Sequence, residues 1–343
     1  MAKGHAFVLG ATGQVGRAAV RALAADGWEV TAGSRRGGRG EDRPEIRSVS
    51  VDRNDEGALA AALGDGVDVL VDIVAYDAGH GRQLTALADR IGSAVVISSG
   101  AVYEDDRGRS FDTQQEPDGF PRYPVPIPET LTTVAPGPSS YSTRKIALER
   151  ELLAAGGTLP TTLVRAGAIH GPYCPGPREA WFVKRALDGR PVRLLAHGGA
   201  ARFHPAHVDN LAELIRLAAA SPGTRVLNGA DPEAPTIAEI GAAIDAVMGV
   251  ASEQVLIPGE PEGTVGLTPW SSAHPIVYDM TAAERELGYR PVVSYADSLP
   301  ATVEWLAGEL TARDWRDAFP GLVKYGLDFF DYAAEDAWLA ARD

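Results

Sequence analysis

Hydrophobic and polar positions follow two alternating periods along the first half of the chain. Short apolar runs rich in Val, Ile and Leu are separated by Ala- and Leu-rich stretches with helical spacing. This rhythm predicts strands at 7–9, 29–32, 47–51, 67–74 and 94–98 and helices at 14–25, 56–63 and 81–91. Strands that alternate with helices of this length form right-handed βαβ units. The pattern therefore predicts an α/β fold with a doubly wound parallel sheet.

A proline-rich stretch at 104–139 interrupts the rhythm. It holds seven prolines and several turn-forming residues, which predicts a long loop. Loops of this length in compact domains are typically functional or disordered. Because this loop leaves the predicted sheet just after Ser99 and returns at Tyr141, we expect it to form a lid over a substrate.

The second half of the chain mixes helices with short strands, which predicts a smaller lobe. A strand is predicted at 161–164 and helices at 142–155, 178–188, 208–220, 237–248 and 297–310. The predicted domains are a sheet domain of 1–165 to which 206–230 return, a substrate-binding lobe of 166–205 and 231–310, and an extension of 311–343. This acidic, aromatic-rich extension packs either against the body of the protein or against a partner subunit, which leaves a homodimer open.

Composition narrows the class of protein and its partners. The formal net charge is -14, so a phosphate backbone is repelled and no nucleic-acid partner is expected. The single cysteine, Cys174, fits a reducing compartment. No stretch reaches the roughly 20 apolar residues of a membrane helix, and residues 1–10 lack the apolar core of a signal peptide. We expect a cytoplasmic protein with a small-molecule substrate and no membrane partner.

A glycine-rich turn joins the first predicted strand to the first predicted helix. Glycines recur every third position, and the segment reads Gly10, Ala11, Thr12, Gly13, Gln14, Val15, Gly16. In a Rossmann fold such glycines allow a tight turn, close approach to a pyrophosphate and close helix packing. Although a lone glycine triplet can be an ordinary turn, its place at the first βα junction predicts dinucleotide binding.

The end of the second predicted strand indicates which dinucleotide is preferred. An NAD site usually has an acidic residue there, whereas this chain has Ser34, Arg35 and Arg36. Guanidinium groups suit a 2'-phosphate, which predicts NADP as the preferred cofactor, with NAD as the alternative. The other interpretation is that both arginines are solvated loop residues. Asp52, which closes the third strand, is expected beside the adenine, and Arg53 is a further candidate for the cofactor site.

Tyr141 and Lys145 stand four positions apart, so on a helix they share one face. A phenol with a pKa of about 10 is a poor base until a positive charge stabilises its anion. Such a pair also arises by chance as exposed helical residues. Here the fifth strand ends in Ser98 and Ser99, which places two hydroxyls at the carboxyl edge of the sheet, where ligands bind in open α/β folds.

Together these motifs resemble the extended short-chain dehydrogenase/reductase superfamily, the NAD-dependent epimerase/dehydratase family. The resemblance covers about residues 5–310 and includes further matching segments at 68–72, 163–165, 170–172, 208–212 and 287–291. It implies that Tyr141 is the general base, Lys145 its supporting cation and Ser99 the hydroxyl donor, with Ser98 the weaker candidate.

The resemblance also extends the candidate binding sites. It adds to the cofactor site Ile73, Val74, Ala75, Ser98, Ala168 and His170. It implies a substrate site made of Tyr76, Ser99, Gly100, Ala101, His170, Arg202 and His204. Three positions depart from the family pattern: Glu104 replaces glycine, Ala166 replaces proline, and Arg202 is one position out of register for holding a sugar diphosphate.

No metal site is predicted. The residues His170, Cys174, His204 and His207 match no zinc spacing, and the resemblance requires no metal.

The expected function is hydride transfer at a hydroxyl or carbonyl carbon of a polar, sugar-like or nucleoside-like substrate, other than a standard diphosphate-linked sugar. The alternative is a non-catalytic relative that senses the cofactor or binds RNA. Because both Tyr141 and Lys145 are present, we favour the enzyme. Gly100 and Ala101 replace the acidic pair of a dehydratase, which leaves a reductase or a sugar epimerase.

Overall fold

The computed structural model describes residues 3–37 and 44–342, so Met1 and Asp343, the ends of the predicted domains, lie outside the described residues. The chain divides into two compact units. Unit 1 comprises Met1–Gly167, Val208–Ala230 and Tyr278–Val292, and unit 2 comprises Ala168–His207, Asp231–Val277 and Val293–Asp343. The return of Tyr278–Val292 to unit 1 differs from the predicted boundaries, which placed those residues in the smaller lobe.

Unit 1 is built on a parallel sheet of seven strands in the order β10-β6-β5-β4-β1-β2-β3. The strands are β1 (His5–Leu9), β2 (Glu29–Ser34), β3 (Ile46–Ser50), β4 (Val67–Asp72), β5 (Ile91–Ser99), β6 (Thr161–Ala166) and β10 (Arg225–Gly229). All neighbouring pairs are parallel, which confirms the predicted Rossmann-type sheet. Chain order reverses between β1 and β4, which is where ligands bind in open α/β sheets.

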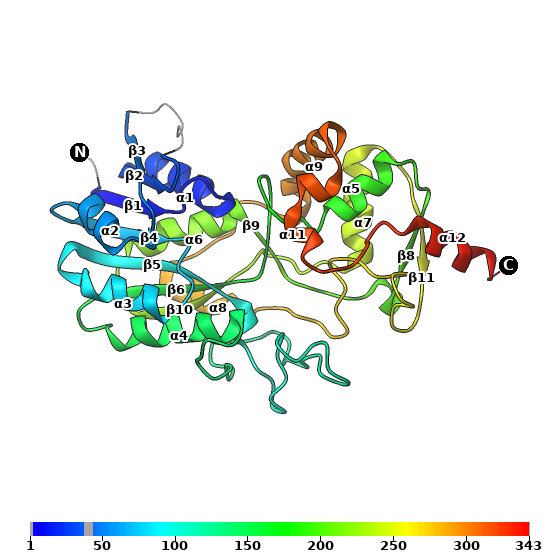
Figure 1. The fold of residues 1–343 in the computed structure, drawn as a ribbon, viewed down its shortest axis with the longest axis horizontal. Coiled ribbons are helices and arrows are strands. Elements are labelled where there is room, and N and C mark those ends of the chain that lie inside the picture. The colour runs from blue at the N-terminus through cyan, green and yellow to red at the C-terminus, as the bar shows by residue number, and fades with distance from the viewer. Residues whose placement is uncertain (1–2, 38–43, 343) are drawn as a thin grey trace. The chain divides into compact units, whose positions relative to one another are not determined.

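Helices cover both faces of this sheet (Figure 1). The helices of unit 1 are α1 (Gln14–Ala25), α2 (Glu56–Leu63), α3 (Ala78–Ala86), α4 (Tyr141–Ala154), α6 (Val208–Ala220) and α8 (Thr281–Leu287). Helices α1 and α6 pack together, as do α3 and α4. The core between the sheet and α2, α3 and α4 is apolar and fully buried, with Phe7, Leu59, Leu84 and Leu148 among its members.

The predicted elements fit the structure well except around α3. The predicted helix 81–91 begins too late and runs too far, because Asp77 caps the helix start and Ile91 already opens β5. The sequence pattern also missed β10 and α8. Both are short elements, for which periodicity carries little information.

The loop at 104–139 contains no helix or named strand, as predicted. It is nevertheless well anchored to unit 1. The Tyr123 hydroxyl donates to the Tyr103 carbonyl at 2.8 Å, and the Glu129 side chain accepts from the Asn228 amide at 2.9 Å. Its function as a lid stays a prediction.

Unit 2 is mainly helical, and its core is rich in aromatic residues. Its larger helices are α5 (Ala180–Leu187), α7 (Ile237–Met248) and α9 (Tyr295–Ala312) (Figure 1). Trp181 and Phe182 of α5 are buried in the core of the unit. Two small parallel sheets complete the unit, one of β7 (Ala168–His170) and β9 (Pro205–His207), the other of β8 (Val192–Leu195) and β11 (Glu253–Leu256).

The C-terminal extension packs on unit 2. It forms α10 (Trp315–Ala318), α11 (Pro320–Val323) and α12 (Tyr332–Ala340). Arg185 donates to Glu335 of α12 at 2.6 Å, and both side chains are buried. The structure thus places these residues against the body of the protein, while the homodimer stays a prediction.

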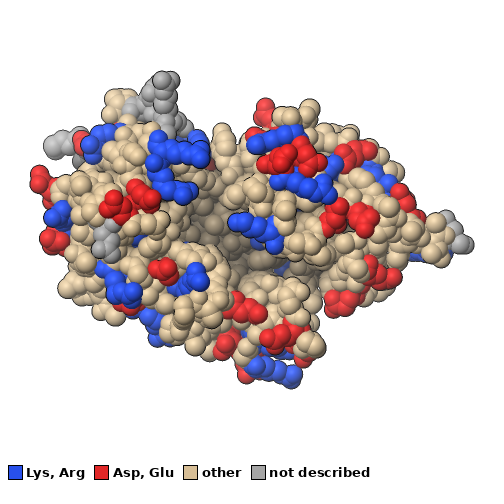
Figure 2. Space-filling view, in the orientation of Figure 1, with Lys and Arg blue, Asp and Glu red and all other residues tan. Residues whose placement is uncertain are grey.

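No helix within residues 3–37 and 44–342 combines the length and apolar character that a membrane span requires. Lys and Arg side chains lie among Asp and Glu side chains over the face shown in Figure 2.

Candidate active site

The glycine turn between β1 and α1 forms a backbone cradle in unit 1. Gly10 has a φ of +84°, and a Cβ there would lie 2.7 Å from Val74. A Cβ on Gly16 would lie 2.1 Å from the Gly10 carbonyl oxygen, so both positions require glycine. The N-cap of α1 is Gly13, which has no side chain, and the start of a helix favours an anion. The turn therefore fits the pyrophosphate of a dinucleotide.

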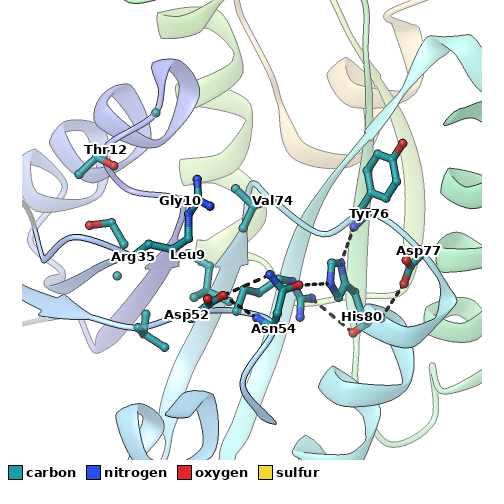
Figure 3. A pocket seen from close by; sticks show the side chains of 15 residues that line it. Leu9, Gly10, Thr12, Arg35, Asp52, Asn54, Val74, Tyr76, Asp77 and His80 are labelled. Carbon is teal, nitrogen blue, oxygen red and sulfur yellow. Dashed lines mark hydrogen bonds between the residues drawn. The ribbon is translucent and has the colours of Figure 1, made fainter.

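A cavity of about 580 Å³ adjoins this cradle (Figure 3). It is lined by Leu9, Gly10, Thr12, Gly13, Gly33, Ser34, Arg35, Val51, Asp52, Arg53, Asn54, Val74, Tyr76, Asp77 and His80. Most predicted cofactor residues before residue 75 line it, and they come from the ends of β1, β2, β3 and β4. Arg36, Gln14, Val15, Gly16, Ile73 and Ala75 are adjacent in sequence but are not among the lining residues.

Arg53 makes its side-chain contacts within unit 1. Arg53 lines the cavity, but its guanidinium is buried and donates to Asp72 at 2.5 Å and to the Gln83 side chain. Asp72 in turn accepts from the Val74 amide at 3.0 Å. The guanidinium therefore holds the turn after β4 in place, and its role in binding a cofactor stays a prediction.

His80, in the first turn of α3, also lines the cavity. The sequence pattern did not indicate it as a candidate site residue. Its Nδ1 accepts from the Tyr76 amide at 2.9 Å, and its Nε2 lies 3.3 Å from the Asn54 side-chain oxygen. Burial lowers the pKa of His80 below 6.5, and the neighbouring Arg53 charge lowers it further. The ring is therefore neutral at pH 7. The one sequence feature that could have indicated the position of His80 is Asp77. An aspartate is a common helix N-cap, and Asp77 caps α3, which places His80 on the first turn of that helix.

Ser99, Tyr141 and Lys145 come together at the carboxyl end of β5. Ser99 is the last residue of β5, and Tyr141 and Lys145 lie one turn apart on α4. The Lys145 ammonium lies 5.8 Å from the centroid of the Tyr141 ring. The Tyr141 side chain is 44% exposed and its ring lies 5.8 Å from that of Tyr76. A phenol, a hydroxyl and an ammonium thus form one group.

The local environment shifts the pKa of both titratable members of this group. Desolvation raises the pKa of the Tyr141 phenol above 10.0, and a side-chain hydrogen bond with Ser99 opposes that rise. Burial lowers the pKa of Lys145 to about 8, while Asp72 and Glu149 act in the opposite direction. At pH 7 Lys145 is therefore protonated, and it can stabilise a phenolate beside it.

The Ser98 side chain is engaged within unit 1, and its cofactor role stays a prediction. Its hydroxyl donates to Glu149 at 2.5 Å, and Glu149 also accepts from Arg165 at 2.7 Å. All three side chains are buried within unit 1. The side-chain alternation of a strand gives neighbouring residues such as Ser98 and Ser99 different directions.

Two more predicted substrate residues lie directly after Ser99. The Ala101 amide donates to the Ser99 hydroxyl oxygen at 3.1 Å. Gly100 packs against Tyr278, because a Cβ there would lie 2.1 Å from the tyrosine hydroxyl. Gly100 therefore serves close packing of Tyr278.

The two histidines predicted to bind ligands, His170 and His204, are buried in unit 2. The Nε2 of His170 lies 2.7 Å from Asp231, and its Nδ1 lies 3.5 Å from Glu179. The His204 ring bonds to the Asp231 carbonyl at 2.8 Å. The exposed fractions are 1% for His170 and 4% for His204, and the binding roles of both stay predictions.

The remaining two predicted residues of unit 2 differ in exposure. Ala168 is buried in β7, whereas Arg202 is exposed. Their binding roles stay predictions. Among residues 3–37 and 44–342, no three His, Cys, Asp or Glu side chains are grouped in a way that could hold a metal ion.

Residues 6–229 match the NAD dependent epimerase/dehydratase family. Solved structures of similar fold include an epimerase from Methanothermobacter thermautotrophicus, which is 17% identical with a TM-score of 0.69 over 91% of this chain and 94% of its own. UDP-glucuronic acid 4-epimerase from Bacillus cereus, solved with NAD and a fluorinated UDP-sugar, is 16% identical with a TM-score of 0.67 over 89% of this chain and 99% of its own.

UDP-glucose 4-epimerase from Thermotoga maritima is 19% identical, again with a TM-score of 0.67, over 89% of this chain and 99% of its own. At these identities the likeness shows the shared fold. None of the curated proteins matches the chain.

Proposed function

The chain belongs to the NAD dependent epimerase/dehydratase family, and from this premise we propose that it is an NAD(P)-dependent reductase or sugar epimerase. It moves a hydride at a hydroxyl or carbonyl carbon of a polar, sugar-like or nucleoside-like substrate. The observation that carries the proposal is the group of Ser99, Tyr141 and Lys145 in the unit that holds the glycine cradle.

The three side chains have distinct roles in this reaction. A bound nicotinamide cofactor supplies the hydride acceptor or donor. The Tyr141 phenolate takes the proton of the substrate hydroxyl during oxidation, and the phenol returns it during reduction. Ser99 donates a hydrogen bond to the substrate oxygen, and the Lys145 charge lowers the free energy of the phenolate.

The proposed cofactor preference is NADP over NAD. Arg35 lines the cavity beside Ser34, and no carboxylate stands at the end of β2. An arginine fork suits a phosphate, whereas the ribose hydroxyls of NAD usually meet a carboxylate. Asp52 also lines the cavity, and we assign it to the adenine.

The substrate class rests on the family and on the polar character of the group. Structures of similar fold include epimerases of UDP-sugars, one of them solved with UDP-glucose. Because Arg202 is out of register for a sugar diphosphate, we favour a sugar-like or nucleoside-like substrate without that group. UDP-sugars are therefore the first alternative in the test.

The test is a substrate screen with both cofactors. Purified protein is titrated with NAD(H) and NADP(H), then incubated with free sugars, nucleosides and UDP-sugars while reduced nicotinamide absorbance and product identity are followed. We expect turnover that is lost in Tyr141→Phe. Nicotinamide absorbance that co-purifies with the protein favours an epimerase, and its absence favours a reductase. Protein that binds neither cofactor overturns the proposal, and binding without turnover on any substrate favours the cofactor-sensing alternative.

A further inference from the structure

A carboxylate of the 104–139 loop holds both neighbours of Tyr141. The Ser140 hydroxyl donates to Oδ2 of Asp112 at 2.6 Å, and the Ser142 hydroxyl donates to Oδ1 at 3.0 Å. Each oxygen of one carboxylate therefore accepts from one residue flanking the proposed base. In the sequence, Asp112 lies 28 residues before Ser140.

These bonds fix the first turn of α4. Ser140 is the N-cap of the helix and also accepts from the Thr143 amide at 3.1 Å, while Ser142 is 1% exposed. A carboxylate at a helix N-terminus is favoured by the helix dipole. Since Tyr141 is the first residue of α4, the direction of its side chain depends on how this turn is held.

The segment around Asp112 is itself ordered by hydrogen bonds. The Asp112 amide donates to the Ser110 hydroxyl at 3.2 Å, and the Thr113 hydroxyl donates to the Gly119 carbonyl at 2.7 Å. Asp105 accepts from the amides of Arg109 and Arg122, at 2.9 Å and 2.8 Å. Asp112 is thus presented to α4 by a loop with its own internal framework.

We propose that Asp112 is a positioning residue for Tyr141 and that it couples the 104–139 loop to the catalytic helix. The proposal rests on the proposed function, because it assigns Asp112 to the same reaction. It differs from simple helix capping, since Ser140 and Thr143 already form a complete capping box. The Asp112 carboxylate connects the 104–139 loop to the two residues that flank Tyr141, and so helps to set the direction of its phenol.

The variants are Asp112→Ala, which removes both acceptors, and Asp112→Asn, which keeps one acceptor oxygen. The matched control is Asp118→Asn in the same loop. Asp118 is also exposed, and its ion pairs are with Arg109 and Arg122 of that loop. Its φ of 51° suits asparagine as well as aspartate, so the control leaves the backbone unstrained.

Two measurements test the proposal on the full chain with cofactor bound. Hydrogen exchange of the α4 amides reports on the first turn, and steady-state kinetics with cofactor titration separates kcat from cofactor affinity. We expect faster exchange at Tyr141 to Lys145 in Asp112→Ala. Since small misplacements of reacting groups are costly, kcat should fall by about tenfold or more. Cofactor Kd should be unchanged, Asp112→Asn intermediate and Asp118→Asn like wild type.

Unchanged exchange in Asp112→Ala would overturn the proposal, and so would faster exchange with a kcat equal to that of Asp118→Asn. If the wild-type protein turned over no substrate, the proposed function would fail. In that case, exchange in α4 would still decide whether Asp112 anchors the turn that begins at Tyr141.

Discussion

The Lys145 ammonium lies 5.8 Å from the centroid of the Tyr141 ring and donates to two backbone carbonyls, those of Ala75 at 2.6 Å and Ile97 at 2.9 Å. The two carbonyls belong to the turn after β4 and to β5. The lysine thereby connects the catalytic helix to the sheet edge beside the cofactor cavity. Replacing Tyr141 and replacing Lys145 should therefore have different effects on the proposed reaction.

Replacing the phenol should stop chemistry without affecting binding. In Tyr141→Phe we expect turnover to fall by about 10²–10⁴-fold, because only proton transfer is lost, while cofactor Kd stays nearly unchanged. Lys145→Ala should impair both, since its ammonium also holds the turn at Ala75. Steady-state kinetics and cofactor titration measure these effects. Substantial activity in Tyr141→Phe would exclude it as the base.

Cofactor choice should depend on Arg35. Charge-assisted hydrogen bonds contribute about 1.5–3 kcal/mol. We therefore expect the Kd for NADP(H) to be lower than the Kd for NAD(H) by about tenfold or more. Arg35→Ala should remove most of this difference. The control is Arg285→Ala, an exposed arginine on α8 whose partner is Glu286. Equal affinity of the wild-type protein for both cofactors in a fluorescence titration would contradict the prediction.

Lys145 should make stability rise with pH. Burial lowers its pKa from 10.5 to about 8, so between these values the unfolded chain binds more protons than the folded protein. The unfolding free energy of the wild type relative to Lys145→Met should therefore increase from pH 8 to pH 10. Denaturant unfolding of both proteins at the two pH values measures this. A constant difference would argue against a depressed pKa.

His170 should stabilise unit 2 most strongly at low pH. Burial alone would lower its pKa, but Asp231 and Glu179 raise it above 6.5. Its contribution is therefore fully present below pH 6.5 and is lost as pH rises through the folded pKa. Thermal unfolding of His170→Gln should show the largest loss at the lowest pH.

His204→Gln is the matched control for this experiment. Burial lowers the pKa of His204, so its contribution has the opposite sign and grows as pH rises toward 6.5. Parallel pH profiles of the two variants would be inconsistent with the opposite pKa shifts.

Replacing only one partner of the buried ion pair between Arg165 and Glu149 should lower the unfolding free energy strongly. Arg165→Met leaves the Glu149 carboxylate buried without its cation, which typically costs about 3–5 kcal/mol. The double variant Arg165→Met/Glu149→Leu should recover much of this loss. Chemical denaturation of the three proteins measures it. A double variant that is no more stable than Arg165→Met would show that the loss has another origin.

The sequence by itself determined those helices and turns whose pattern of residues lies within the segment itself. The helices at 14–25, 56–63, 208–220 and 237–248 were predicted with the ends that the structure has, because their apolar periodicity lies within each segment. The glycine turn was also evident, since the positive φ of Gly10 and the close approach of backbone at Gly16 favour glycine at these positions. The spacing of Tyr141 and Lys145 was evident for the same reason, because both residues lie within one short helix.

Only the tertiary structure decided which polar side chains remain accessible. His170 meets Asp231 across 61 residues of sequence, Ser98 meets Glu149 across 51, and Arg53 meets Asp72 across 19. All three are predicted to bind ligands, and in each case a carboxylate distant in sequence forms a short contact with the side chain. A buried polar group requires a partner, and the packing of distant segments chooses it, so local sequence patterns do not encode the result.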